Sequence, residues 1–344
     1  MPNSLTASSD SSASGAKAMP RITVGITAYN RPEMLRECVA SILGQSYKNF
    51  DILIGNDYVD GPVTFASLGI PVDPRIRIVN HPQNIGAYNN NYFLLREASG
   101  DWFTWLADDD LMHPDFLQIA YEVLSENDVN SVFSNYVAAP DPVGLFPKAI
   151  VRRHPEIFDG HEFIGRYTSR RLKVVGSYGV FRREILPDIG GVHRFGTGLA
   201  VYVDTFIPIV AASLGRVAYV DLDLVFLRTH AGSASATSND LDAYLTAQRD
   251  YLAEFDKRCR RLAGGSFDQW ANDTLIWFAT DVWAVICRGR LTALPRLWTF
   301  FRYVADILKP HIPQRFATPF LSFVTKLVLV DTLKQSARRV LRRH

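Results

Sequence analysis

The stretch 102–114 constrains what this chain can fold into more than any other. An apolar run, Trp102–Ala107, is followed at once by three aspartates, Asp108–Asp110, and Pro114 then opens an amphipathic segment. A strand that ends in clustered acids and leads into a helix places those acids at the carboxyl edge of a sheet. Because open α/β sheets bind their ligands at that edge, the stretch predicts a ligand site there.

The three adjacent carboxylates have two interpretations. Like charges raise one another's pKa unless a cation lies among them, and hard oxygen ligands favour Mg²⁺ or Mn²⁺. Asp and Pro are also ordinary residues at the start of a helix, so the triplet equally fits a solvated acidic turn before Pro114. The stretch taken alone leaves both interpretations open.

Length and composition bound the class of protein. With 344 residues, of which 47% are hydrophobic, the chain is long enough for two domains or for one large domain with an appendage. Its formal net charge of +2 shows no polyelectrolyte signature, so no nucleic-acid partner is predicted. Cys38, Cys259 and Cys287 have the spacing of neither a disulfide framework nor a metal site, which favours a cytoplasmic location. The sequence shows neither a signal peptide nor an apolar run of about 18 residues.

The order of apolar and polar segments predicts strands that alternate with helices. Residues 1–18, rich in Ser, Ala and Gly, have too few large apolar side chains to offset the cost of ordering and are predicted to be disordered. Strands are predicted at 21–28, 50–55, 75–79, 102–107 and 131–134, and helices at 32–43, from about 87 to 100, and from 114. This alternation predicts a mostly parallel sheet flanked by helices.

The next part of the chain is predicted in less detail. Residues 138–175 are expected to be irregular, as an insertion or lid on the acceptor side of the site. The segment 177–182 is predicted as a strand, and 205–214 as an apolar helix. The segments 215–220 and 222–227 are predicted as a final pair of strands.

Three strands are predicted to end in polar turns, at Thr27–Arg31, Asn56–Asp57 and Asp108–Asp110. In a parallel sheet these turns share one edge, where a carboxylate can accept from a base or a ribose and a metal can neutralise a diphosphate. Neither a G-x-G-x-x-G segment nor a P-loop is present, so cations would have to meet the phosphate charge. Judged alone, Asp57 fits an ordinary turn residue better than a ligand.

Five segments follow one another in a diagnostic order: Ile26–Pro32 (ITAYNRP), Ser41–Tyr47 (SILGQSY), Ile54–Asp57 (IGND), Asn84–Gly86 with Ala98–Trp102, and Ala107–Asp110 with Pro114. They are similar to the motifs PTYNRP, SILxQTY, VVDDGS, NxG…AxGxY and DxDD…P. The chain therefore resembles the inverting, family 2 type glycosyltransferases over about residues 21–230. The resemblance implies a GT-A fold, with a Rossmann-like sheet, across residues 19–235.

The resemblance also implies roles for residues in the first half. Asp57 would contact the base, Asp108 would hold the ribose, and Asp109 and Asp110 would bind Mn²⁺ or Mg²⁺ on the diphosphate. The remaining nucleotide-binding residues that it implies are Thr27, Tyr29, Asn30, Arg31, Asn84 and Gly86.

Four positions depart from the family's motifs. Ala107 replaces the usual first aspartate of the metal motif, so which of the three aspartates ligates the metal stays open. Asn56 replaces the first aspartate of the base-binding turn, Val203 replaces the first acid of the ED motif, and Tyr92 stands where an asparagine is frequent. These departures motivate an alternative hypothesis, a non-catalytic protein that binds a nucleotide-sugar or serves as a scaffold with a degenerate site.

Asp204 lies at the position of the family's ED motif, whose acid is the catalytic base. Inverting transfer is a direct displacement, so one carboxylate must accept the proton of the attacking hydroxyl. A metal stabilises the departing phosphate oxygens. The other interpretation is that Asp204 caps the helix that follows it.

Two further segments match family elements. Arg228-Thr229-His230 resembles an RxH element, which implies that Arg228 contacts the diphosphate and His230 the metal. The segment 177–191 resembles G…FRRExLxxxGG, and Ser177 is assigned to the diphosphate or acceptor.

Residues 236–344 are predicted to be a helical extension. A helix at 241–262 is followed by three apolar segments, 275–287, 297–308 and 316–333, which basic residues interrupt. Each segment is too short or too charged to span a bilayer. Apolar faces flanked by arginine fit a peripheral contact with anionic lipid on the cytoplasmic face of a membrane. They equally fit packing on the catalytic core or on a second subunit of a homo-oligomer.

The sequence therefore predicts a metal-dependent inverting glycosyltransferase. It would move a sugar from a nucleotide-diphosphate donor to a hydroxyl of a polysaccharide or glycolipid. A UDP or dTDP donor is preferred because Asp57 suits the N3–H of uracil or thymine. A nucleotidyltransferase on a similar fold would need a Gly-rich first loop with Arg or Lys, which Thr27–Pro32 does not provide.

Overall fold

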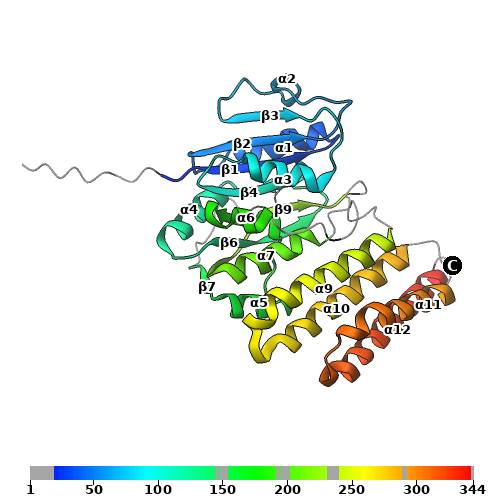
Figure 1. The fold of residues 1–344 in the computed structure, drawn as a ribbon. Coiled ribbons are helices and arrows are strands. Elements are labelled where there is room, and N and C mark those ends of the chain that lie inside the picture. The colour runs from blue at the N-terminus through cyan, green and yellow to red at the C-terminus, as the bar shows by residue number, and fades with distance from the viewer. Residues whose placement is uncertain are drawn as a thin grey trace, which may run out of the picture.

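A computed structural model describes residues 19–142, 144, 146, 154–190, 195, 202–230, 240–288 and 293–341. The predicted disordered segment 1–18 lies outside these residues. In the described part, nine strands form one mixed sheet with helices on both faces, and four long helices follow it along the chain (Figure 1). The predicted α/β architecture is confirmed.

The first four long strands form the parallel half of the sheet. Strand β1 (Ile22–Ala28) lies between β2 (Phe50–Asn56) and β4 (Trp102–Ala107), and β3 (Ile76–Asn80) pairs with β2. All of these pairs are parallel, with Thr27 opposite both Gly55 and Ala107. The polar turns that follow β1, β2 and β4 therefore share one edge, as the sequence predicted.

The second half of the sheet contains the antiparallel pairs. Strand β8 (Val180–Arg182) runs antiparallel between β4 and β6 (Ser131–Ala139). Strand β9 (Val217–Arg228) is parallel to β6 and antiparallel to β5 (Leu111–Met112). Because β8 reverses direction in the middle, the sheet is mixed rather than parallel throughout.

Two strand predictions in this half were wrong. The segments 215–220 and 222–227 form one strand, β9, and its pairing with β6 shifts register twice near Asn135. Such bulges accommodate extra residues without ending a strand, so Asp221 does not separate two strands. The predicted strand 177–182 begins only at Val180, after a 3₁₀ turn at Gly176–Tyr178.

The prediction that 138–175 is irregular was wrong for its second half. Residues Glu156–Phe158 form β7, which pairs with β9, and Gly160–Thr168 form helix α5. The Asp159 carboxylate accepts the Glu162 N–H at 2.8 Å and so caps this helix. Apolar side chains on one face of α5 enter the core, which explains why this segment is ordered.

The helices around the sheet form two layers. One face is covered by α1 (Pro32–Leu43) and α4 (Phe116–Glu126), which pack with Ile22, Val24 and Ile26 of β1. The other face carries α3 (Ala87–Glu97), α5, α6 (Leu186–Gly190) and α7 (Val203–Leu214). A short helix, α2 (Phe65–Leu68), lies between β2 and β3 along the chain. This is the layered architecture of an α/β protein.

The C-terminal helices extend the core of the second face. They are α9 (Leu241–Ala263), α10 (Phe267–Arg288), α11 (Ala293–Tyr303) and α12 (Ala317–Leu341), with a π-helical turn at Val304–Leu308. One hydrophobic cluster runs from α5 and α7 through α9 and α10 to α11 and α12. Among the described helices, none combines the length and apolar character that crossing a bilayer needs.

Candidate active site

Asp108 and Asp109 follow β4 and meet a cation from the turn after β1. The Arg31 guanidinium lies 2.6 Å from a carboxylate oxygen of each aspartate, and Asp108 also accepts the Tyr29 N–H at 2.8 Å. Asp108 is fully buried. Burial raises the pKa of Asp108 to about 6, against the opposing effect of Arg31. The sequence placed these two turns on one edge, and the structure brings their charged groups into contact.

Asp110 is engaged on both of its oxygens. One accepts the Tyr178 hydroxyl, and the other accepts the Arg228 N–H at 2.8 Å. Burial, with the neighbouring Asp109 charge, raises the pKa of Asp110 to about 7. Asp110 thus connects the end of β4 to β8 and β9, and sequence analysis missed Tyr178 as its partner.

The predicted Arg228–His230 element reaches the same turn. The His230 Nε2 atom lies 2.9 Å from the Asp109 Oδ2 atom. The Arg228 Nε–H donates to the Asp109 carbonyl at 3.1 Å, and its guanidinium also pairs with Glu37 of α1. Three elements distant in sequence therefore converge on Asp109.

The predicted metal ligands differ in how well they fit a cation. Asp109 and His230 offer a carboxylate oxygen and an imidazole nitrogen side by side, a donor pair that suits Mn²⁺ or Mg²⁺. Asp110 is instead turned to Tyr178 and Arg228. Within the described residues, no group of three His, Cys, Asp or Glu side chains has the geometry of a metal site. Of the predicted ligands, Asp109 and His230 lie closest together, and the Asp109 Oδ2 atom that His230 contacts also pairs with Arg31.

A pocket on one side of the triplet gathers half of the predicted nucleotide-binding residues. It is lined by Tyr29, Asn30, Arg31 and Asp108, together with Tyr58 from the turn after β2. Tyr29 is exposed, and its ring meets that of Tyr58 edge to face at 5.5 Å between centroids. An exposed aromatic ring beside a carboxylate and a guanidinium can hold a base, a ribose and a phosphate.

Asp57 anchors the loop that leads into α3. Its two oxygens accept the N–H groups of Ile85 and Gly86 at 2.7 and 2.8 Å, and Asp57 is buried. Asn84 accepts the Gly86 N–H at 2.9 Å, and Gly86 has a φ of +83° that favours glycine. The structure brings Asp57, Asn84 and Gly86 together. None of them lines the pocket of Tyr29 and Asp108, or the second pocket around Asp204.

Asn56 has a structural explanation for its departure from the family motif. Its side-chain NH₂ donates to the carbonyls of Tyr58 and Gly61 and to the Asn80 side chain, at 2.8 to 3.2 Å. A carboxylate in this buried place would have no hydrogen to donate to these three acceptors.

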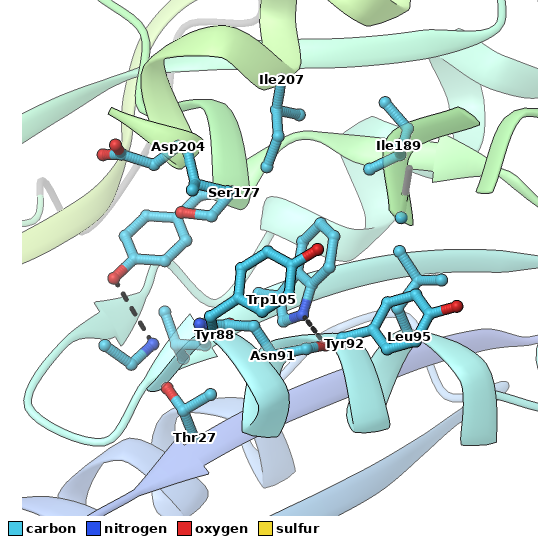
Figure 2. Close-up of a pocket in the computed structure, with 15 residues that line it drawn as sticks. Thr27, Tyr88, Asn91, Tyr92, Leu95, Trp105, Ser177, Ile189, Asp204 and Ile207 are labelled. Carbon is cyan, nitrogen blue, oxygen red and sulfur yellow. Dashed lines mark hydrogen bonds between the residues drawn. The ribbon is translucent and has the colours of Figure 1, made fainter. Parts of the chain in front are cut away.

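A second pocket lies on the other side of the strand ends (Figure 2). Three predicted residues line it: Thr27 at the end of β1, Ser177 in the 3₁₀ turn, and Asp204 at the start of α7. Figure 2 shows Asp204 and Ser177 on one wall, with Thr27 and the aromatic side chains of α3 on the other. The remaining lining includes the aromatic residues Tyr88, Tyr92, Trp105 and Tyr178.

Asp204 is the second residue of α7 and not its N-cap, which is Tyr202. The Asp204 residue is exposed to solvent, and the protein atoms packed around its carboxyl raise the pKa of that group. The N–H groups of Thr205 and Asp204 itself, together with Arg170, oppose that shift. The start of α7 lies against Gly176, where a Cβ would come within 1.7 Å of the Asp204 carbonyl oxygen. The backbone of α7 is thus held closely against the turn that carries Ser177.

Residues 23–190 match the family model described as Glycosyl transferase family 2. The matched region, just under half of the chain, is a glycosyltransferase family 2 domain. The predicted enzyme class is confirmed at the level of this family.

Curated relatives agree with this assignment of the transferase. Glycosyltransferase GlyG of Streptococcus pneumoniae is 27% identical over 246 residues, which cover 69% of this chain and 79% of GlyG. O-antigen biosynthesis protein RfbC of Myxococcus xanthus is 27% identical over 197 residues, or 51% of this chain. The match spans only 15% of RfbC, and 37% of an uncharacterized glycosyltransferase of Haemophilus influenzae.

The fold of the transferase resembles that of S. aureus TarS, solved in complex with UDP-GlcNAc. The TM-score is 0.51 at 13% sequence identity, over 83% of this chain and 88% of that chain. At this identity the likeness concerns the fold alone, and the predicted GT-A fold is confirmed.

The start of α7 in this transferase is also tied to the C-terminal helices. The Tyr202 hydroxyl accepts from the Gln248 amide at 2.8 Å, and the Gln248 carbonyl accepts from the Tyr303 hydroxyl at 2.6 Å. All three residues are buried, and Tyr202 has a φ of +64°. The Tyr167 hydroxyl donates to the Thr205 carbonyl at 2.9 Å. Sequence analysis missed this network because its members are 46 and 55 residues apart.

The aromatic lining of the Asp204 pocket was also missed, although the sequence held a signal for part of it. Tyr88 and Tyr92 are four residues apart at the start of α3, so they share one helix face directly after the predicted Asn84–Gly86 turn. An aromatic pair at that spacing, beside a predicted site, indicates a pocket wall. Trp105 gave no such signal, because buried strand residues of this kind are ordinary core.

Proposed function

We propose that this protein transfers a sugar, with inversion, from a nucleotide-diphosphate donor to a hydroxyl of a polysaccharide or glycolipid. The observation that carries the proposal is the pocket in which Asp204 faces the ends of β1 and β4. The same strand ends carry the acidic triplet and the nucleotide pocket on their other side. A base on one side and a phosphate-binding edge on the other are what a direct displacement requires.

We propose that the nucleotide lies in the pocket formed by Tyr29, Asn30, Arg31 and Asp108. Asp108 would accept from the ribose hydroxyls, and Thr27 would line the site where the two pockets meet. For Asp57 to accept the N3–H of uracil or thymine, the base must reach past the lining of this pocket, to a buried carboxylate whose oxygens each already accept one amide. TarS binds UDP-GlcNAc, but the preference for UDP or dTDP rests on Asp57.

We propose that Asp109 and His230 hold Mn²⁺ or Mg²⁺. The metal, when bound, neutralises charge on the diphosphate leaving group. Asp110 orients this turn through Tyr178 and Arg228 rather than serving as a first choice of ligand. Arg228 and Arg31 add positive charge at the same edge, in a chain with no glycine-rich phosphate loop.

We propose that Asp204 accepts the proton of the attacking hydroxyl, with Ser177 beside it positioning the acceptor. Its raised pKa makes the carboxylate a stronger base than an aspartate with the ordinary pKa. The aromatic wall of Tyr88, Tyr92 and Trp105 offers the apolar faces on which a sugar ring packs.

One observation favours the alternative of a non-catalytic nucleotide-sugar-binding protein or scaffold. Arg31 pairs with both Asp108 and Asp109, so a guanidinium neutralises the carboxylates that a ribose and a metal would engage. If that arrangement persists with donor present, the site binds without catalysing transfer.

Isothermal titration tests the donor site directly. UDP, dTDP and GDP would each be titrated into the full chain with Mn²⁺, with Mg²⁺ and with EDTA. We expect UDP or dTDP to bind in the presence of metal and to bind weakly or not at all in EDTA. Binding of none of the three to folded protein contradicts the proposed donor site.

We propose that the acceptor is reached at the cytoplasmic face of a membrane, as a glycolipid or a membrane-bound polysaccharide. The support is the excess of Lys and Arg over Asp and Glu in residues 289–344, which would attract anionic lipid.

A further inference from the structure

Helices α11 and α12 expose large apolar side chains. On α11, Leu294, Trp298 and Phe301 follow a spacing of four and three residues, so they form one stripe, and Leu294 is 79% exposed. On α12, Leu321, Leu329 and Val330 are also exposed. Exposed apolar surface gathered in this way marks a contact with a protein or a membrane.

The opposite faces of the same helices are used inside the molecule. Phe300 and Tyr303 of α11, and Phe320 and Val324 of α12, are buried in the cluster that includes α10. Each helix therefore has two apolar faces. One packs on the core, and the other is exposed. Packing among the residues that the structure describes does not account for the outer rows. In Figure 1 these helices lie at the end of the molecule away from the sheet.

The charge around these rows is strongly one-sided. Of the 37 Lys and Arg and 35 Asp and Glu in the chain, 11 and 2 lie in residues 289–344. This segment therefore carries a formal charge of +9, whereas residues 1–288 carry −7. The Arg302 guanidinium lies 5.3 Å from the centre of the Trp298 ring and pairs with Asp306 at 3.3 Å, and Lys326 is exposed on α12 near Leu329. Cations thus flank the apolar rows.

The charge distribution discriminates between the two occupants that would cover such a surface. A two-fold dimer places the same patch of each copy against the other, so it would bring together two copies of the stretch 293–330, which holds five Lys or Arg and one Asp. Like charges opposed across an interface are unfavourable. An anionic bilayer offers the complementary charge, an apolar layer for Trp298 and Leu294, and headgroups for the arginines.

We propose that the outer faces of α11 and α12 dock in the plane of an anionic membrane, with the exposed apolar rows in the headgroup boundary. This fits the finding that none of the described helices can cross a bilayer. The inference names the surface for the membrane contact of the proposed function, but lipid binding itself requires no turnover.

Co-sedimentation with vesicles tests the proposal on the full chain. One set of vesicles is phosphatidylcholine alone, and the other contains about 30 mol % phosphatidylglycerol to supply anionic charge. We expect binding to the anionic vesicles at low salt, weaker binding at high salt, and little binding to phosphatidylcholine alone.

A matched pair of variants locates the docking surface. Leu294→Glu places a charge in the α11 stripe, whereas Val72→Glu changes an equally exposed residue, 78% against 79%, in the loop before β3. We expect Leu294→Glu to lower the partition coefficient by about tenfold or more. It removes a leucine that would enter the membrane on binding, and it adds a negative charge that the anionic lipids repel. Val72→Glu should bind as the unmodified protein does.

Three outcomes overturn the proposal. The first is an absence of binding to anionic vesicles at low salt, and the second is an equal loss of binding in both variants. The third concerns the oligomeric state. A concentration-dependent dimer in light scattering that Leu294→Glu dissociates would assign the surface to a second copy instead. An assay of transfer to a soluble acceptor, run in parallel without lipid, reports separately on the proposed function.

Discussion

The two walls of the candidate active site are held in place in different ways. The acidic triplet is held by groups on neighbouring strand ends, chiefly Arg31, Tyr178 and Arg228. The start of α7, which carries Asp204, is held by the Tyr202–Gln248–Tyr303 network that joins it to the C-terminal helices. The phosphate-binding side is thus built by the sheet itself, whereas the position of the base depends on helices from outside the sheet.

We expect the largest effect at Asp109, which is proposed to hold the metal together with His230. Asp109→Asn keeps the shape of the side chain but removes the charge that faces Arg31 and His230. We expect metal-dependent donor binding to fall on the order of a hundredfold or more. Titration of UDP with Mn²⁺ measures it, and unchanged metal-dependent affinity would contradict the assignment of Asp109.

The next effect concerns the turn after β2. Asn56→Asp restores the residue that the family motif has, yet it replaces an amide that donates to three acceptors. We expect it to lower the free energy of unfolding by about 2 to 3 kcal/mol, because buried acceptors lose their donor and face a carboxylate. Chemical denaturation measures the change. An equal or higher stability would show that the departure at this position is not structural.

A smaller effect is expected in the network behind Asp204. Tyr303→Phe removes the hydroxyl that donates to Gln248. We expect kcat to fall by about tenfold with little change in donor affinity, because a small displacement of the Asp204 carboxylate lowers the rate of transfer more than it lowers donor binding. Tyr251→Phe is the matched control, because the buried Tyr251 hydroxyl has no hydrogen-bond partner among the described residues. Equal kcat values in the two variants would contradict a positioning role for the network.

The smallest effect is a shift of pH dependence. Desolvation raises the pKa of Asp204, so the carboxylate takes up a proton at a higher pH than an aspartate with the ordinary pKa does. A protonated carboxyl cannot act as a base, and we therefore expect the acid limb of kcat to lie above the ordinary aspartate range. A pH profile of saturated turnover measures it, and an acid limb at the ordinary position would argue against Asp204 as the titrating group.

The sheet-built side of the site was predictable from the sequence, and the reason is local. Each strand there is an apolar run that ends in a polar turn, and parallel strands place such turns on one edge. Pro32 at the first position of α1 marked the start of that helix. Asp108–Asp110 and Arg31 could therefore be assigned to one edge before any contact was known, whereas His230 was assigned through the resemblance of 228–230 to an RxH element.

The support of the base was not predictable, because it depends on contacts between distant segments. No local pattern relates Tyr202 to Gln248 or Gln248 to Tyr303. Helix α5 was missed for a different reason. Its apolar positions, Phe163, Ile164 and Tyr167, and its cap, Asp159, do follow a helical pattern, but they lie in a segment read as an insertion. The domain boundary predicted near residue 235 stays a prediction, and the core is continuous across it.

The most direct test of the central claim compares turnover and donor binding in Asp204→Asn. The substitution keeps the size of the side chain and removes its ability to accept a proton. The account predicts that transfer to an acceptor falls by about a thousandfold or more, while the affinity for the nucleotide donor in the presence of metal stays within about twofold. Transfer at the unmodified rate would contradict the role of Asp204 and, with it, the proposed mechanism.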